Sequence, residues 1–150
     1  MPRVDRPSRA RLTAWEQFLR AHVTIVERLD RDLVEQHGLP LAWYDVLVQL
    51  EAAGGESTMG DLASSLLIAP SSCTRIVGRM SASGLAERRT DEHDHRVRRV
   101  RLTPQGRTML KTAARSHLAG IQRHFGAFLT DGEASALADR FEAMRRSAVD

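Results

Sequence analysis

The sequence has little of what several classes of protein require. Its single cysteine, Cys73, excludes an internal disulfide scaffold and a zinc site with several cysteine ligands. No apolar run approaches the roughly 20 residues that cross a bilayer, and the polar start of the chain has no signal-peptide core. Serine, histidine and aspartate occur without a nucleophile elbow or a phosphate-binding glycine loop, which disfavours a hydrolase. We therefore expect a cytoplasmic protein with no membrane partner, no catalytic or metal site and no cofactor.

Lysine is also nearly absent, and this makes the positive charge almost entirely arginine. Only Lys111 is lysine among 22 basic residues. Residues 71–107 hold nine arginines against four acids, whereas residues 1–70 hold seven against ten. A genome rich in G and C explains the bias toward arginine but not this clustering. A short basic stretch of this kind indicates a docking place for a polyanion such as DNA.

Apolar residues at helical spacing predict six helices. The first runs from Ser8 to about residue 36, and the second is opened by Pro40 and ended by Gly54. Thr58 and Asp61 resemble a capping box at the start of a short third helix. The remaining helices are expected from Pro70 to about residue 83, from Pro104 and from Asp131.

After Gly84 the helical period gives way to alternation. Residues 85–90 and 97–102 alternate around the polar stretch 91–96, which predicts a β-hairpin. The expected fold is mainly α (α+β): a winged helix-turn-helix with one β-hairpin wing and long N- and C-terminal dimerisation helices. We expect a single domain over residues 1–150, with dimerisation helices at about 8–37 and 104–149 and a DNA-binding lobe at about 39–103.

The helix that begins at Pro70 is the expected recognition helix, because such helices read base edges from their first turns. Its predicted DNA contacts are Ser71, Ser72, Thr74 and Arg75. No acid occurs between Asp61 and Glu87, so this surface would not repel phosphate. The alternative is a serine-rich helix start that only caps itself.

The hairpin is the second predicted contact, with His95, Arg96 and Arg98 as its DNA-binding residues. An arginine at the loop tip suits the negative potential of the minor groove. Asp91 and Asp94 are expected to pair with strand arginines and so to hold Arg96 at the tip. The alternative is a solvated hairpin whose charges are incidental.

These segments resemble the MarR family of transcriptional regulators. The wing signature is Leu85-Ala86-Glu87-Arg88-Arg89, then Asp91-x-x-Asp94-x-Arg96 and Val100-x-Leu102-Thr103-x-x-Gly106-Arg107. Thr74-Arg75-Ile76-Val77-x-Arg79-Met80 matches the family's recognition helix. The chain departs from the family at Ala69 and Pro70, where relatives often have a serine cap and then a polar residue.

The resemblance implies a homodimer that binds double-stranded DNA at a palindromic operator, usually as a repressor that a small molecule releases. A small aromatic or carboxylate effector would suit a pocket of aromatic and basic residues. The predicted ligand-binding residues are Trp15, His22, Trp43, Tyr44 and His117. At helical spacing such residues are more often core or interface. The alternative function is a winged-helix fold that binds a ligand or a protein without specific operator binding.

Two further features have structural interpretations. Cys73 falls on the inward face of the expected recognition helix, where a buried thiol behaves as a small apolar group rather than as a redox sensor. His93 and His95 have metal-ligand spacing, but no third ligand is evident nearby. We expect both histidines to be surface residues of the wing.

Overall fold

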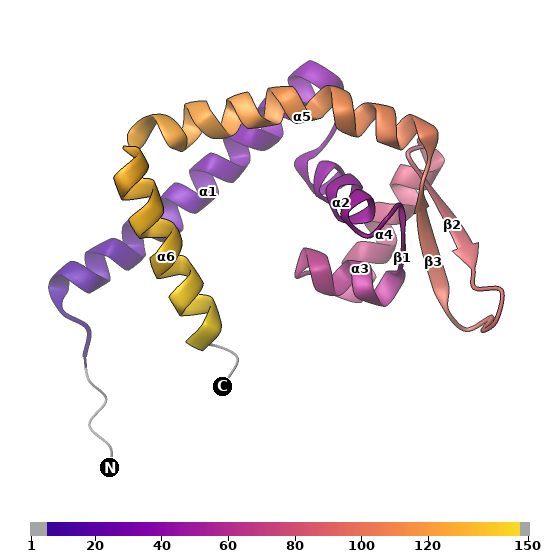
Figure 1. The fold of residues 1–150 in the computed structure, drawn as a ribbon, viewed down its shortest axis with the longest axis horizontal. Helices are drawn as coiled ribbons and strands as arrows, with labels where there is room; N and C mark the ends of the chain where they lie inside the picture. The colour runs from indigo at the N-terminus through magenta and orange to yellow at the C-terminus, as the bar shows by residue number, and fades with distance from the viewer. Residues whose placement is uncertain (1–5, 148–150) are drawn as a thin grey trace, which may run out of the picture. The chain divides into compact units, whose positions relative to one another are not determined.

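The computed structural model describes residues 6–147. Figure 1 shows the order of its helices and strands, and positions 148 and 149 of the expected C-terminal helical segment lie outside the described residues. The elements are α1 (Arg9–His37), α2 (Leu41–Ala52), β1 (Glu56–Thr58), α3 (Met59–Leu66), α4 (Pro70–Ala82), β2 (Ala86–Thr90), β3 (Arg98–Leu102), α5 (Pro104–His124), η1 (Gly126–Phe128) and α6 (Asp131–Ser147).

The chain forms two compact units. One contains the described residues up to Leu29 together with those from Gly120 onward, and the other contains Asp30–Ala119. The division falls inside the long helices α1 and α5. Leu33 of α1 and Ala113 of α5 are buried in the core of the second unit, which explains why these helix portions belong with the winged helix-turn-helix.

Capping side chains and prolines mark the starts of the helices in the second unit. Thr58 caps α3 by accepting a hydrogen bond from the Asp61 N–H at 3.1 Å, so the predicted N-cap is confirmed. Pro70 is the first residue of α4, as predicted. Pro40, by contrast, is the residue before α2 rather than its first residue, because its ψ of 143° is extended.

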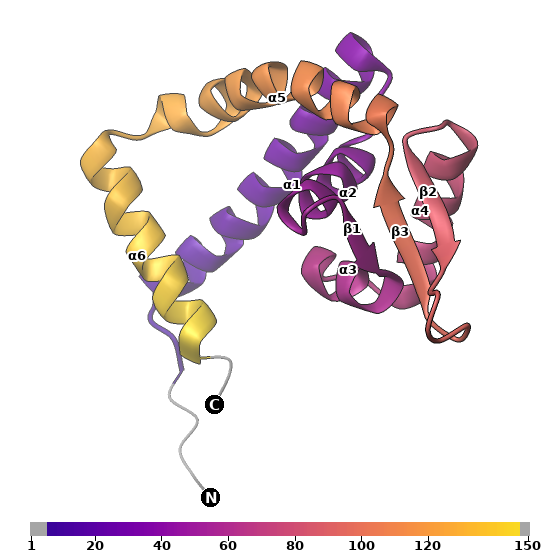
Figure 2. The same cartoon turned by 45° about the vertical axis from the view of Figure 1, so that its right-hand side comes forward.

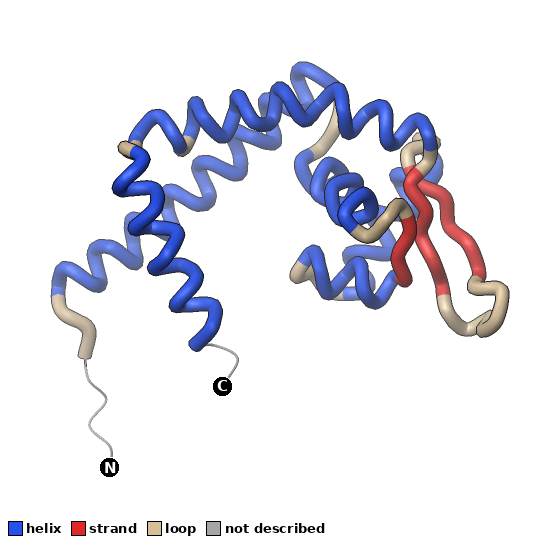
Figure 3. The backbone as a smooth tube through the Cα atoms, in the orientation of Figure 1, coloured by secondary structure: helices blue, strands red, loops and turns tan. Residues whose placement is uncertain are grey.

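The wing is part of a three-stranded antiparallel sheet in the order β1-β3-β2 (Figure 3). The predicted hairpin of β2 and β3 is confirmed, and Arg88 lies opposite Val100 in its register. The strand β1 was not predicted, because three residues are too short to show alternation. It forms by pairing Glu56 with Arg101 and Thr58 with Arg99, more than forty positions away along the chain.

One apolar core holds the second unit together. It joins α2, α3, α4 and the sheet through side chains that are almost inaccessible to solvent, including Leu47, Leu50, Leu62, Val77, Met80 and Val100. Figure 2 turns this unit so that the three strands and α4 can be followed. Burial of this kind contributes about 1.5–3 kcal/mol for each large aliphatic side chain. The helix-turn-helix and the wing are therefore parts of one rigid unit.

The first unit has a different distribution of apolar residues. Phe18 of α1 and Phe141 of α6 contact each other with ring centroids 5.6 Å apart. Many large apolar side chains of this unit nevertheless remain exposed, among them Leu12, Trp15, Leu19, Val23, Phe128 and Met144. Within the described chain, no helix combines the length and apolar character needed to cross a membrane.

Candidate nucleic-acid interface

The first turn of α4 has no side-chain cap. The residue before the helix is Ala69, which offers no acceptor to the free N–H groups of the first turn. Among the described residues, neither Ser71 nor Ser72 forms a side-chain cap of this helix. The partial positive charge of this helix end is consequently available to an anion.

The predicted recognition residues lie mainly on the outer side of α4. Ser71, Thr74 and Arg75 are exposed, whereas Ser72 is half-buried. The Thr74 hydroxyl donates to the Pro70 carbonyl at 3.0 Å. Cys73 is fully buried on the opposite side of the helix, as predicted.

Arg88 of β2 extends the outer surface of α4. Its guanidinium donates through Nη2 to the Thr74 carbonyl at 3.4 Å. It lies over Gly78, where a β-carbon would collide with it. The absence of a side chain at Gly78 therefore lets an arginine from the wing strand rest against the recognition helix.

The loop between β2 and β3 is fastened by its own carboxylates. Asp91 Oδ1 accepts from the N–H groups of His93 at 2.9 Å and Asp94 at 3.0 Å. Asp94 Oδ1 accepts from the Arg96 N–H at 2.9 Å. These backbone hydrogen bonds hold the pKa of Asp91 below its ordinary value. The side chains of His95 and Arg96 are exposed on this ordered loop.

The predicted pairing of the two aspartates with strand arginines is half right. Asp91 Oδ2 lies 3.3 Å from Arg99 Nη1 and forms the expected ion pair. Asp94 instead holds the Arg96 backbone, because its side chain points along the loop and not toward the strands.

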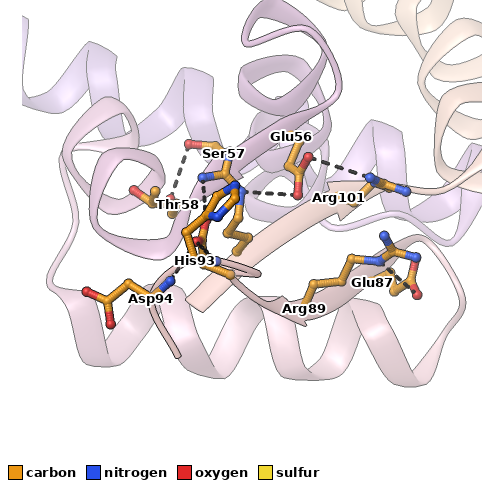
Figure 4. Close-up of polar contacts among 10 residues, drawn as sticks. Glu56, Ser57, Thr58, Glu87, Arg89, His93, Asp94 and Arg101 are labelled. Atoms are coloured by element: carbon orange, nitrogen blue, oxygen red, sulfur yellow. Dashed lines mark hydrogen bonds and ion pairs between the residues drawn. The ribbon is translucent and has the colours of Figure 1, made fainter. Parts of the chain in front are cut away.

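Arginines of the wing fall into two classes according to sheet face. Arg89, Arg99 and Arg101 share one face, where each has a carboxylate partner. Figure 4 shows this face, with Glu56 reaching Arg101 and Glu87 pairing with Arg89. This face also bounds an open polar hollow whose positive charges are already balanced by acids.

The second class of arginines has no carboxylate partner within the described residues. Its members are Arg75 and Arg79 on α4, Arg88 and Arg98 on the other sheet face, and Arg96 in the loop. Arg98 donates to the Thr90 hydroxyl at 2.7 Å. Sequence reasoning missed Arg79 and Arg88. The position of Arg79, one helical turn after Arg75, was a signal for it, whereas Arg88 becomes recognisable only from its contact with α4.

The predicted ligand-binding residues are divided between the two units. Trp43, Tyr44 and His117 belong to the second unit, where the rings of Tyr44 and His117 contact each other at a tilt, with centroids 4.5 Å apart. Partial burial lowers the pKa of His117, and the charge of Asp45 opposes this in part. His117 Nδ1 is buried without a hydrogen-bond partner in the described chain. Trp15 and His22 belong to the first unit, where both flank the ring of Phe18.

The remaining candidate groups have ordinary environments. Burial raises the pKa of the Cys73 thiol, which keeps it protonated and unreactive. His93 and His95 are exposed. No group of three histidine, cysteine, aspartate or glutamate side chains is placed to hold a metal ion in the described part of the chain.

A family model for MarR proteins matches residues 37–97, which cover the helix-turn-helix and most of the wing. The crystal structure of AbsC, a MarR family transcriptional regulator from Streptomyces coelicolor, covers 97% of this chain and 98% of its own, with a TM-score of 0.87 and 25% identity. Over residues 37–97 the chain is similar to the MarR family, and its fold is that of a MarR family regulator.

Two other proteins are similar to this chain. Sco3205, a MarR family transcriptional regulator from Streptomyces coelicolor solved in complex with DNA, is 23% identical, covers 95% of this chain and 92% of its own, and gives a TM-score of 0.88. YsmB, an uncharacterized HTH-type transcriptional regulator of Bacillus subtilis, is 28% identical over 79% of this chain and 80% of its own. The MarR fold is thus found along nearly the whole chain.

Proposed function

We propose that this protein is a transcriptional regulator of the MarR family that binds a palindromic operator in double-stranded DNA as a homodimer in the cytoplasm. The observation that carries the proposal is the sorting of its arginines: those on one sheet face are neutralised by acids, and those on and beside α4 are not. Unpaired arginines are the groups that phosphates and guanine edges attract. MarR-family proteins regulate transcription, and we propose a regulatory rather than a catalytic role here.

Each predicted DNA-binding residue has a distinct role in this proposal. The exposed side chains at the start of α4 enter the major groove, with Arg75 reading a guanine and Ser71 and Thr74 contacting bases or phosphates. Ser72, being half-buried, offers its backbone N–H at the helix N-terminus to a phosphate. In the wing, Arg96 enters the minor groove, with His95 and Arg98 beside the backbone.

The first unit supplies the proposed dimer interface. Trp15 is 57% exposed, Met144 63% and Phe128 75% within a single chain, and further apolar residues of α1 are exposed around Trp15. So many exposed large apolar side chains are typical of a permanent interface rather than of a monomer. In the proposed dimer the two α4 helices lie about 34 Å apart, the distance between successive major grooves.

We further propose a small aromatic or carboxylate effector that releases the operator. Tyr44 and His117 form a tilted ring contact, Trp43 precedes Tyr44 in α2, and the unpartnered Nδ1 of His117 can bond an acidic group. Trp15 and His22 remain predicted ligand residues in the first unit. Two proteins with this fold support the ligand class. RdhR-CbdbA1625 was solved with 2,4-dichlorophenol (21% identity, TM-score 0.82), and DNA binding by BpsR of Bordetella bronchiseptica is regulated by 6-hydroxynicotinic acid (22%, TM-score 0.79).

The decisive experiment is selection of bound fragments from the source genome with the purified protein, followed by footprinting. We expect enrichment of a palindrome whose half-sites are about one helical turn apart. Arg75→Ala should then weaken binding to that palindrome by about 1–3 kcal/mol while changing binding to random duplex much less. If no fragment is enriched, the protein is a ligand-binding or protein-interaction module instead. Sedimentation of the free protein tests the dimer separately.

A further inference from the structure

A continuous chain of charged contacts leads from strand β1 to the tip of the wing. It begins at Glu56, whose Oε1 accepts from Arg99 Nε at 3.2 Å and whose Oε2 lies 3.7 Å from Arg101 Nη2. Glu56 and Arg101 are directly opposite in the sheet register. Glu56 is therefore the point at which β1, which is outside the hairpin, holds the two outward arginines of β3.

Arg99 connects Glu56 to the loop between β2 and β3. Its guanidinium is held between two carboxylates, because Nη1 lies 3.3 Å from Asp91 Oδ2 while Nε contacts Glu56. The three side chains are only 20–33% exposed. Fully exposed ion pairs contribute little, but a planar guanidinium between two partly shielded carboxylates has a fixed orientation. The position of Asp91 consequently depends on Glu56.

Asp91 in turn holds the backbone of the loop by hydrogen bonds. Its other oxygen, Oδ1, accepts from the N–H groups of His93 and Asp94. Asp94 in turn accepts from the N–H of Arg96, the residue at the tip. The loop is closed behind them by the Asp91 N–H, which donates to the Val97 carbonyl at 3.0 Å.

We propose that Glu56 is a positioning residue for DNA binding, which holds the wing loop through Arg99 and Asp91 in the conformation that presents Arg96. This role rests on the proposed function of the protein. It runs against simple electrostatics, because a carboxylate near DNA repels phosphate and its removal should strengthen binding. The positioning role therefore predicts that removal of the Glu56 carboxylate weakens DNA binding, whereas simple electrostatics predicts that it strengthens binding.

The chain offers a matched control for this substitution. Glu87 lies opposite Arg101 from the other side of β3, in the same row of the sheet as Glu56. Its carboxylate contacts Arg89 at 3.4 Å and has no link to Asp91. Glu56→Gln and Glu87→Gln therefore remove the same charge from the same sheet face, and only the first weakens the connection to the loop.

The experiment measures binding of the full chain to a mixed-sequence 30-bp duplex by fluorescence anisotropy, at salt concentrations from about 50 to about 200 mM. We expect Glu56→Gln to weaken binding and to reduce the slope of log K against log salt by about one, the contribution of one phosphate contact. Glu87→Gln should bind as well as the wild type or better. In a protein that already carries Arg96→Ala, adding Glu56→Gln should weaken DNA binding no further.

Three results would overturn the proposal: equal effects of Glu56→Gln and Glu87→Gln, a full additional loss on the Arg96→Ala background, or no effect of Arg96→Ala itself. Should circular dichroism show that Glu56→Gln is unfolded, Asp91→Asn decides the question. It breaks the link to Arg99 from the other end and keeps an oxygen for the loop N–H groups. A wild-type protein that does not bind the duplex in a salt-dependent manner would instead refute the proposed function.

Discussion

The guanidinium of Arg88 rests on α4 at Gly78, in the space that a side chain at this position would occupy. Alanine is normally better than glycine inside a helix by about 1 kcal/mol. Here its methyl group would displace Arg88 and break the hydrogen bond to the Thr74 carbonyl. We expect Gly78→Ala to increase the free energy of unfolding by clearly less than this amount in urea denaturation.

The same substitution in an Arg88→Ala background is the control for that prediction. Once the guanidinium is gone, Gly78→Ala should give the full helix-propensity gain of about 1 kcal/mol. Equal gains in the two backgrounds would show that Arg88 does not occupy the surface of Gly78 in solution.

The two classes of arginine predict different salt dependences of DNA binding. Arg96 has no carboxylate partner among the described residues, so Arg96→Ala should reduce the salt slope by about one and weaken binding on all sequences. Arg89 is paired with Glu87, so Arg89→Ala should leave the slope nearly unchanged. Anisotropy titrations at several salt concentrations measure both. A slope change for Arg89 as large as that for Arg96 would argue against the division into classes.

Much of this fold follows from the sequence, because helical period and local caps are properties of neighbouring residues. The hairpin was equally visible from alternation. The partner of the hairpin was not, since β1 has only three residues and depends on pairing with β3. Without β1 the carboxylate of Glu56 has no known position, and the sequence alone could not separate paired from unpaired arginines.

The residues of the candidate DNA-binding site could likewise be predicted only in part from the sequence. Ser71, Thr74 and Arg75 could be placed on the outer side of α4 because helical spacing relates them to the buried Cys73. Arg88 could not, because its place beside α4 depends on the absence of a side chain at Gly78, a contact between a helix and a strand. Long-range contacts of this kind carry no periodic signal.

Leu67, in the turn between α3 and α4, has a left-handed backbone with φ 55° and ψ 39°. This conformation costs a residue with a β-carbon about 1 kcal/mol or more. The Leu67 side chain is 92% exposed and so contributes little to packing. Leu67→Gly removes this cost but adds conformational entropy to the unfolded chain. The net effect should be a rise of about 0.5 kcal/mol in the free energy of unfolding. Leu66→Gly, inside α3 and half-buried, should lower it in the same denaturation experiment.

The lowered pKa of His117 makes the stability of the second unit dependent on pH. Partial burial disfavours the charged imidazole in the folded protein, so the unfolded chain takes up this proton first as the pH falls below the ordinary value of 6.5. The contribution to stability is full above that value and is lost progressively below it. We expect the wild type to lose stability as the pH falls below this ordinary value, and His117→Leu to lose less.

The two carboxylates with a lowered pKa act outside this pH range. The lowered pKa of Asp91 and that of Glu133, both caused first by backbone hydrogen bonds, affect stability only in more acidic solution, below their ordinary values of 3.8 and 4.5. Burial raises the pKa of Asp45, whose charge interacts with that of His117, so Asp45 stabilises the folded protein as the pH falls and opposes the effect of His117. Removal of the exposed wing histidine in His93→Gln is the matched control and should leave the pH dependence of the wild type intact. Thermal unfolding followed at several pH values measures the difference. Parallel curves for the wild type and His117→Leu would mean that His117 accepts its proton as readily in the folded protein as in the unfolded chain.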